Sequence, residues 1–358
     1  MTTTSSSTPR WLLYGASGYT GRLIAEEAVR RGHRPVLSGR SREKLAPLAD
    51  ALGLEVRPAA LDDARQLTAA MEGLPLVLHA AGPFVHTSEP MRQACLASRT
   101  HYLDITGEIP VFEGSFRHDA EAKERGVSLM SGVGFDVVPT DCLARYVADQ
   151  VPGATELDIA IAAGSQASAG TTKSALLQLP EGGRVRRDGV LQPYPMGQGA
   201  RPQRFIDRER TVMPIPWGDL STAYRTTGIP NITTYMAFPS SSARALRWTY
   251  PALRQLLKLS PVRDGLMKLV ESRVTGPTAD MRLSGRSQVW AQARAPDGRS
   301  AQAWLEVPEG YVFTARASLH AVEELLAQPS PGALTPAGAF GADFVLRIDG
   351  CRRLDSLG

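Results

Sequence analysis

Short apolar runs alternate with amphipathic stretches over residues 10–163. The runs have the length of buried strands, about four to eight residues: RWLLYG, RPVLSG, EVRPAA, LPLVLHAAG, HYLDI and VSLM. Between two of them, EKLAPLADALG places Leu45, Leu48 and Leu52 on one helical face and ends at a glycine, Gly53. Strands in alternation with helices form a parallel, doubly wound sheet. The pattern therefore predicts an α/β domain over residues 10–150.

The pattern changes after ELDIAIAAG, and a second domain of the α+β type is expected over residues 151–335. Glycine- and proline-rich turns there separate mixed strands and two helical stretches. Asp297-Gly298 lies between polar-apolar strands, which is typical of a hairpin turn. The long stretch ARALRWTYPALRQLLKLSPVRDGLMKLV is apolar and basic at helical spacing and is broken at Ser260-Pro261.

The two ends of the chain are assigned separately. Residues 1–9 are expected to form a disordered tail, because MTTTSSSTP has no apolar core of a signal peptide. Residues 336–358 contain FVLRIDG, which predicts one more strand that returns to either domain.

A glycine motif follows the first predicted strand in WLLYGASGYTGRLIAEE. Gly15 permits the tight turn, Gly18 lets the backbone approach a pyrophosphate, and Gly21 allows close packing of helix on strand. The helix that follows begins near Tyr19 and Thr20, whose free N–H groups can bind the anion. The first domain is therefore predicted to be a Rossmann domain that binds a dinucleotide, with Ser17 also in the loop.

The end of the second strand selects the cofactor. NAD enzymes usually carry an acidic residue there that accepts from the ribose 2′-hydroxyl. This chain has Gly39, Arg40 and Ser41 instead, with Lys44 close behind. A guanidinium can bind a 2′-phosphate through two hydrogen bonds, so NADP(H) is favoured over NAD(H). The alternative is a solvated basic turn before a helix.

Two further strand ends are candidates for cofactor contacts. Asp62 follows the third run and is expected either to contact adenine or to cap the next helix. Ala81, Gly82 and Pro83 end the fourth run, where small residues leave room for ribose and nicotinamide. A tight strand end without ligand contact is the alternative.

Composition excludes several classes of function. The net charge is +4 and no block of like charges occurs, so a nucleic-acid partner is not expected. The three cysteines, Cys95, Cys142 and Cys351, form no CxxC pair, which favours a reduced cytoplasmic protein without a metal site. No run of about 18 apolar residues occurs, so a membrane partner is not expected. The 243–270 stretch is interpreted as a cover helix over the second sheet or the substrate mouth, and the alternative is a helix that lies on a membrane surface.

Several segments resemble a known family in their order along the chain. They are YGASGYTGRL, LSGRSREKL, HAAGPFVHTSEPMRQAC, HYLDITGE and GVGFDVVPTDCLA, followed by the weaker segments AGTTKSAL, TGIPNITTY, PEGYVFTARA and TPAGAFGADFVLRIDG. Together they resemble the saccharopine dehydrogenase-like oxidoreductases, and most closely the branch that includes the bacterial trans-acting enoyl reductases. The resemblance implies NADPH-dependent reduction of a C=C or C=N bond, with the substrate between the two domains. The Gly-x-Asp-Pro-Gly stretch of saccharopine reductase is replaced here by Gly134-Phe135-Asp136, which argues against saccharopine itself as substrate.

Polar residues at two strand ends are the candidate catalytic groups. Tyr102, Asp104 and Glu108 follow one strand and Asp136 follows the next, so they should border the nicotinamide. Reduction also needs a proton, which a tyrosine, a carboxyl with raised pKa, or water could give. Each carboxylate could instead cap a helix or anchor a loop. Lys173 in AGTTKSAL could reach the cleft from the second domain.

The sequence thus predicts an NADPH-dependent reductase of an activated C=C bond in a polyketide or lipid-like intermediate. The expected partner is a small-molecule substrate, either free or linked to a carrier or lipid, and a homodimer through the second domain is left open. A reductase of imine or saccharopine-type C=N adducts is the first alternative. A non-catalytic NADP(H)-binding sensor or adaptor is the second, because a fold does not define a function.

Overall fold

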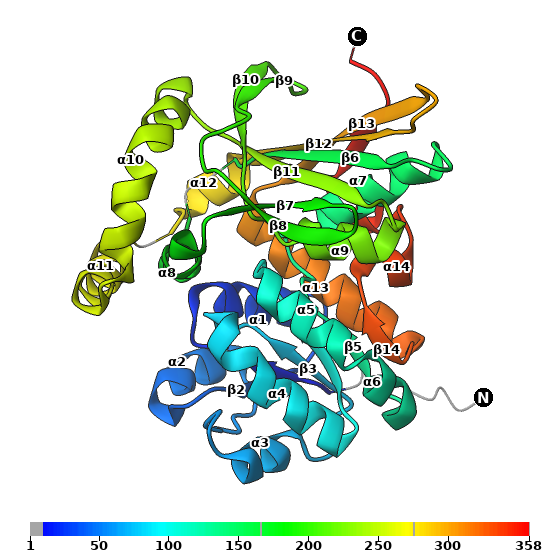
Figure 1. Cartoon of the computed structure of the whole chain (residues 1–358). Coiled ribbons are helices and arrows are strands. Elements are labelled where there is room, and N and C mark those ends of the chain that lie inside the picture. The colour runs from blue at the N-terminus through cyan, green and yellow to red at the C-terminus, as the bar shows by residue number, and fades with distance from the viewer. Residues whose placement is uncertain (1–9, 165–166, 275, 358) are drawn as a thin grey trace.

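The chain folds around two β-sheets that lie one above the other (Figure 1). The computed structural model describes residues 10–164, 167–274 and 276–357. The residues expected as an N-terminal tail, 1–9, lie outside this described part.

The first sheet has six strands, all parallel, in the order β14-β5-β4-β3-β1-β2. Its strands are β1 (Leu12–Tyr14), β2 (Val36–Ser38), β3 (Leu76–His79), β4 (His101–Asp104), β5 (Ser128–Met130) and β14 (Gly332–Leu334). The helices between the first five are α1 (Tyr19–Arg30), α2 (Arg42–Leu52), α3 (Ala64–Met71), α4 (Phe84–Ser98), α5 (Ile109–Arg117) and α6 (Asp119–Arg125). The predicted parallel sheet is therefore confirmed.

Both faces of this sheet are buried, which explains why its strands are continuous apolar runs. Successive residues of a strand point to opposite faces. Leu13 of β1 accordingly packs in one core cluster, while Leu12 and Tyr14 pack in another. Helix α1 packs against the late helix α13 (Gly310–Ala327), and α3 packs against α4.

The run EVRPAA does not form the predicted strand. It makes one isolated bridge, between Val56 and Leu37. The segment does run beside β2, because Leu37 N donates to the Glu55 carbonyl at 2.8 Å and Arg57 N donates to the Leu37 carbonyl at 3.0 Å. Since β2 ends at Ser38 and the chain then turns toward α2, the segment has too short a partner to form a ladder.

The second sheet is mixed and has nine strands. They are β6 (Glu156–Ala162), β7 (Gly183–Arg187), β8 (Val190–Tyr194), β9 (Arg201–Arg204), β10 (Glu209–Pro214), β11 (Asn231–Ala237), β12 (Arg286–Arg294), β13 (Ser300–Pro308) and β15 (Arg352–Leu354). Strands β6 and β11 are parallel, whereas the other pairs are antiparallel. The predicted α+β type and the hairpin at Asp297-Gly298, which joins β12 to β13, are confirmed.

The C-terminal part of the chain crosses between the sheets. After α13, strand β14 pairs with β5 of the first sheet, although its residues fall in the range expected for the second domain. The prediction of a strand at FVLRIDG is wrong, because Phe344–Arg347 form a 3-10 helix, η2. This turn buries Phe344 and Val345 together, whereas an extended strand would point them to opposite sides. Strand β15 then joins the second sheet.

The basic, apolar stretch forms two helices, α10 (Ser240–Lys258) and α11 (Ser260–Arg273), with the break at the predicted place. They lie at one edge of the molecule (Figure 1), where α11 contacts α8 (Ala169–Gln178) and α10 contacts η1 (Leu179–Glu181). The remaining helices are α7 (Val138–Asp149), α9 (Asp219–Thr227), α12 (Ala279–Ser284) and α14 (Pro336–Phe340). Within the described ranges, no helix has the length and hydrophobicity that crossing a bilayer requires.

Candidate active site

The glycine loop lies between the carboxyl end of β1 and the start of α1. Gly15 has a φ of +85°, and a Cβ at this position would lie 2.7 Å from the Ala81 backbone nitrogen. A Cβ on Gly21 would lie 2.3 Å from the Gly15 carbonyl oxygen, so this position also requires glycine. These close approaches fit the packing that a dinucleotide loop needs.

The start of α1 has the groups that an anion site needs. Gly18 is the N-cap residue and brings no side-chain hydrogen bond. The N–H groups of Tyr19 and Thr20 donate to no other group in the described part of the chain. The first turn of α1 contains no acidic residue. Free N–H groups and the positive end of the helix dipole together suit a pyrophosphate.

The end of β3 borders the loop. Ala81 touches Gly15, and the Gly82-Pro83 peptide is cis and leads into α4. The Ala81 carbonyl accepts from the Thr87 hydroxyl at 2.7 Å. The small residues predicted to line the cofactor therefore lie directly beside the glycine motif.

The residues expected to select the cofactor follow β2, whose last residue, Ser38, accepts from Gly15 N through its carbonyl at 2.9 Å. Burial raises the pKa of the Tyr14 phenol to about 12. The nearby Arg40 charge lowers this pKa, and the Asp62 charge raises it. Arg40 and Asp62 thus both lie near the Tyr14 hydroxyl at the end of β1. Arg40 is exposed and has no hydrogen bond or ion pair with any described residue, so its guanidinium is available to a ligand.

The neighbouring predicted residues have mixed roles. The Ser41 hydroxyl accepts from Lys44 N at 3.3 Å and caps α2, and Gly39 lies just before it. The cap of α3 is Asp63, whose carboxylate accepts from Arg65 N and Gln66 N at 3.0 Å each. Asp62 makes no such cap and is exposed.

Substitution of Arg40 by aspartate should remove the preference for the phosphorylated cofactor. We expect the unmodified protein to bind NADPH at least tenfold more tightly than NADH, about 1.4 kcal/mol, and Arg40→Asp to abolish or reverse this ratio. Calorimetric titration of both nucleotides measures it. Arg204→Asp, an exposed arginine of β9, is the control and should leave the ratio unchanged. Equal affinities in the unmodified protein would contradict the assignment.

Tyr102 and Asp104, two of the predicted catalytic residues, are fully buried and bonded to each other. The Tyr102 hydroxyl donates to Asp104 Oδ2 at 2.7 Å, and burial raises the pKa of this phenol well above 10.0. Asp104 also accepts from the Ser131 hydroxyl at 2.8 Å and from the Thr106 and Gly132 N–H groups at 3.0 Å each. Four donors thus occupy the carboxylate, which ties together the loops after β4 and β5.

Glu108 also holds backbone in place. Its carboxylate accepts from Phe84 N at 3.0 Å and Val85 N at 2.7 Å, and so caps the start of α4. It also accepts from the Ser174 hydroxyl at 2.8 Å. Because Ser174 lies on α8, this bond joins the two domains beside the predicted nicotinamide site. Lys173 lies next to Ser174 on the same helix and is half-buried.

Asp136 differs from the other candidate carboxylates because no described residue donates a hydrogen bond to its side chain. It lies after β5, and a Cβ on Gly107 would be 2.7 Å from its Oδ2 atom. Its main-chain carbonyl accepts from Trp217 Nε1 at 2.6 Å, which fixes the backbone. Burial raises the pKa of Asp136 to about 7, and the Glu108 charge adds to this shift.

Sequence reasoning did not identify three residues of the second half of the chain that adjoin this site: Trp217, Asp219 and Tyr311. The Tyr311 ring packs edge-on against Tyr19 at 5.0 Å, and its hydroxyl contacts Ser168 N and the Thr171 hydroxyl. Burial raises its pKa, and Asp136 raises it further. The only signal was the run PEGYVFTARA, which is part of the family resemblance.

Asp219 is fully buried at the start of α9, and neither carboxylate oxygen has a hydrogen-bond partner in the described part of the chain. Burial raises its pKa well above the usual value, and the charges of Asp141 and Asp136 raise it further. Asp136 and Asp141 of the first domain and Asp219 of the second therefore lie close together where the domains meet. Nothing in the local sequence Trp-Gly-Asp indicates this burial.

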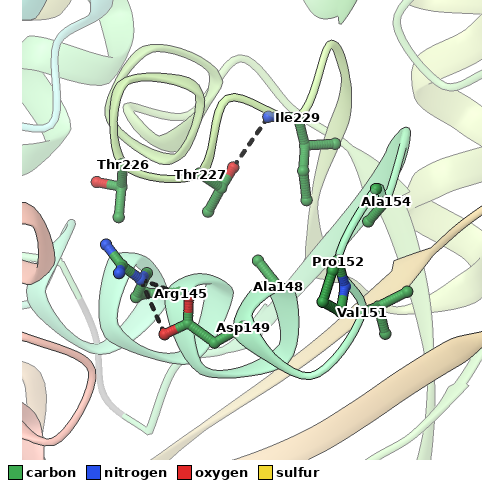
Figure 2. Close-up of a pocket in the computed structure, with 10 residues that line it drawn as sticks. Arg145, Ala148, Asp149, Val151, Pro152, Ala154, Thr226, Thr227 and Ile229 are labelled. Atoms are coloured by element: carbon green, nitrogen blue, oxygen red, sulfur yellow. Dashed lines mark hydrogen bonds and ion pairs between the residues drawn. The ribbon is translucent and has the colours of Figure 1, made fainter.

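One cavity lies beside α7 and a second lies beside the start of α5. The larger, about 280 Å³, lies toward the C-terminal end of α7, and Figure 2 shows its Arg145–Asp149 ion pair and the Thr227 hydroxyl accepting from Ile229 N. Asp136 lies before the start of the same helix, about 15 Å away at 1.5 Å per residue. The smaller cavity, about 170 Å³, is lined by Ile109, which follows Glu108 in the chain, and by Pro216, which precedes Trp217.

Comparisons with known proteins define the class of the first domain. Residues 11–130 match the saccharopine dehydrogenase NADP binding domain. The strand order, the glycine loop and Arg40 agree with this match. The first domain is therefore an NADP-binding domain of the saccharopine dehydrogenase type, and its cofactor is NADP(H).

Similar proteins extend the match to the rest of the fold. The chain is 29% identical over 256 residues to a rat saccharopine dehydrogenase-like oxidoreductase, covering 60% of this chain and 58% of that one. It is 30% identical over 211 residues to a trans-acting enoyl reductase of Mycobacterium bovis, covering 54% and 50% of the two chains. The yeast saccharopine dehydrogenase (L-Glu forming) shares the fold, with a TM-score of 0.65, 12% identity and coverage of 97% and 100%. The chain thus matches about half the length of the curated relatives.

Proposed function

We propose that the chain is an NADPH-dependent reductase of an activated C=C bond, in which Asp136 donates the proton. The first domain, residues 10–150 with the returning strand β14, holds the cofactor, and the second, residues 151–335 without β14, closes over the substrate. The observation that carries the proposal is the Asp136 carboxyl. It is half-buried, lacks a hydrogen bond from any described residue, and has a pKa raised to about 7 by burial.

The chemistry divides between cofactor and protein. NADPH, when bound, supplies the hydride. The carbon next to the hydride acceptor must then receive a proton, and an acid whose pKa lies near the working pH does this best. The O–H bond of Asp136 breaks as the new C–H bond forms, and the carboxylate left behind takes a proton from water. Asp104 and Glu108 hold the surrounding loops, since their carboxylates are occupied by protein donors.

The smaller cavity supports an apolar substrate. Its lining includes Ile109, Pro110, Leu191 and Pro216. The cation in the lining, Arg184, lies 3.5 Å from Glu181, so its charge is already balanced. A saccharopine-type adduct with several carboxylates would need unpaired cations there. The enoyl reductases among the similar proteins agree with a C=C substrate, and we extend the proposal to a chain linked to a carrier or lipid.

The test is NADPH consumption by the purified chain, followed by absorbance, with three kinds of substrate. An enoyl thioester should be reduced, whereas a saccharopine-type imine should not. Reduction of the imine alone would replace the proposal with the C=N alternative. Tight NADPH binding with turnover of neither would favour a sensor or adaptor.

The setting of the protein forms part of the proposal. Cys95 and Cys142 are buried and Cys351 is partly buried, all as free thiols, which suits a reducing cytoplasm. A homodimer through the second domain is included as well, and light scattering in solution would test it.

A further inference from the structure

A segment of the second domain lies directly on the glycine loop. The Tyr19 hydroxyl donates to the Pro277 carbonyl at 2.8 Å, a contact between residues 258 positions apart. Arg282 Nη1 donates to the same hydroxyl at 2.9 Å and to the Pro277 carbonyl at 3.1 Å. Gly276 approaches so closely that a Cβ there would lie 3.2 Å from Tyr19 Cε2. We call residues 276–285 the strap.

Arg282 supplies the strap with a charge that the protein does not neutralise. Its guanidinium is half-buried and bonds two neutral oxygens, and no carboxylate in the described ranges pairs with it. Its Cζ atom lies 5.8 Å from the centroid of the Tyr19 ring. A partly buried guanidinium normally binds a carboxylate or a phosphate, because burial of an unpaired charge is unfavourable.

The position of this cation makes the absence of a protein anion significant. Tyr19 is the first residue of α1, whose N-terminus carries a partial positive charge and has no acidic residue in its first turn. A cation near a helix N-terminus is disfavoured by the dipole unless an anion lies close to both. The diphosphate of a dinucleotide carries two negative charges and occupies this end of the glycine loop.

We propose that Arg282 binds the diphosphate of NADP(H) and that the strap closes the second domain over the bound cofactor through Tyr19. The cofactor is then held from both domains: from below by the N–H groups of α1, and from above by the Arg282 guanidinium. Tyr311 also packs edge-on against the Tyr19 ring, so Tyr19 links the strap to the candidate active site.

The test compares NADPH and NADH affinities without substrate, by fluorescence titration. Arg282→Met should weaken both nucleotides at least tenfold, because both contain the diphosphate. Arg282→Lys should recover part of the loss, since it restores the charge. Tyr19→Phe should weaken both by a smaller factor, because the charge remains but its hydroxyl contact is lost.

The matched control is Arg286→Met. Arg286 is an exposed arginine next to the strap, and its guanidinium donates to the Gly285 carbonyl. Its affinities should not change. Unchanged affinities in an Arg282→Met protein with a normal thermal midpoint would overturn the proposal. A loss confined to NADPH would place Arg282 at the 2′-phosphate and overturn the diphosphate assignment. Because no substrate is present, the result does not depend on the proposed reductase activity.

Discussion

Substitution of Gly18 by valine should abolish NADPH binding while the protein stays folded. Gly18 has a φ of −75° and a ψ of 166°, an extended conformation that valine adopts readily. A Cβ there meets only the Gly15 carbonyl oxygen, at 3.3 Å, so a shift of a few tenths of an ångström accommodates it. The methyl groups would occupy the space of the pyrophosphate. We expect a loss of at least about 100-fold, roughly 2.7 kcal/mol, by calorimetry.

Two other glycines make the result specific. Gly265→Val in α11 places the same side chain where nothing lies within 4 Å, and should leave binding unchanged. Gly21→Val should lower the thermal midpoint instead, because its Cβ would lie 2.3 Å from a backbone oxygen. Normal NADPH affinity in folded Gly18→Val would show that the loop has been misinterpreted.

The first sheet could be predicted wherever strand identity depends on local sequence. β1 to β5 are buried on both faces, so each is a short apolar run followed by a helical pattern. Strand β14 has no such signal in PGALTPAG. It exists because Gly332 N donates to the Val127 carbonyl at 2.9 Å and Ala333 N donates to Asp119 Oδ1 at 2.8 Å. Both partners lie about 200 residues earlier, beyond the reach of a local pattern.

The candidate site could be predicted where the backbone itself makes the contact. A turn with positive φ and a close helix approach require glycine, so the cofactor loop is visible in the sequence. The roles of the carboxylates are not visible. Asp104 and Asp136 follow neighbouring strands, but four protein donors reach Asp104 and none of those described reaches the Asp136 side chain. That difference depends on which loops fold together. Arg282 and Tyr311 come from the second domain, whose sequence shows no motif.

Asp136→Asn should lower kcat about 100-fold, roughly 2.7 kcal/mol in the barrier, and leave NADPH affinity unchanged. The amide keeps the size of the side chain but cannot transfer the proton, and general acids contribute at least this factor. Since burial raises the pKa of Asp136 to about 7, the acid form is present below that pH and lost above it. In the unmodified protein kcat/KM should therefore fall about tenfold per pH unit above about 7. The variant should lack this dependence.

The neighbouring polar residues provide the comparison. Tyr102→Phe, Asp104→Asn and Glu108→Gln each remove contacts that hold loops, so they should lower the thermal midpoint rather than kcat in the surviving protein. Asp149→Asn, which removes an exposed partner of Arg145, should change neither. If Asp136→Asn retains full turnover and the same pH profile, Asp136 is not the donor. The proton must then come from water or from the second domain, and Lys173 and Tyr311 are the residues to substitute next. Lys173 lies next to Ser174, which bonds Glu108, and Tyr311 lies close enough to Asp136 for that charge to raise its pKa.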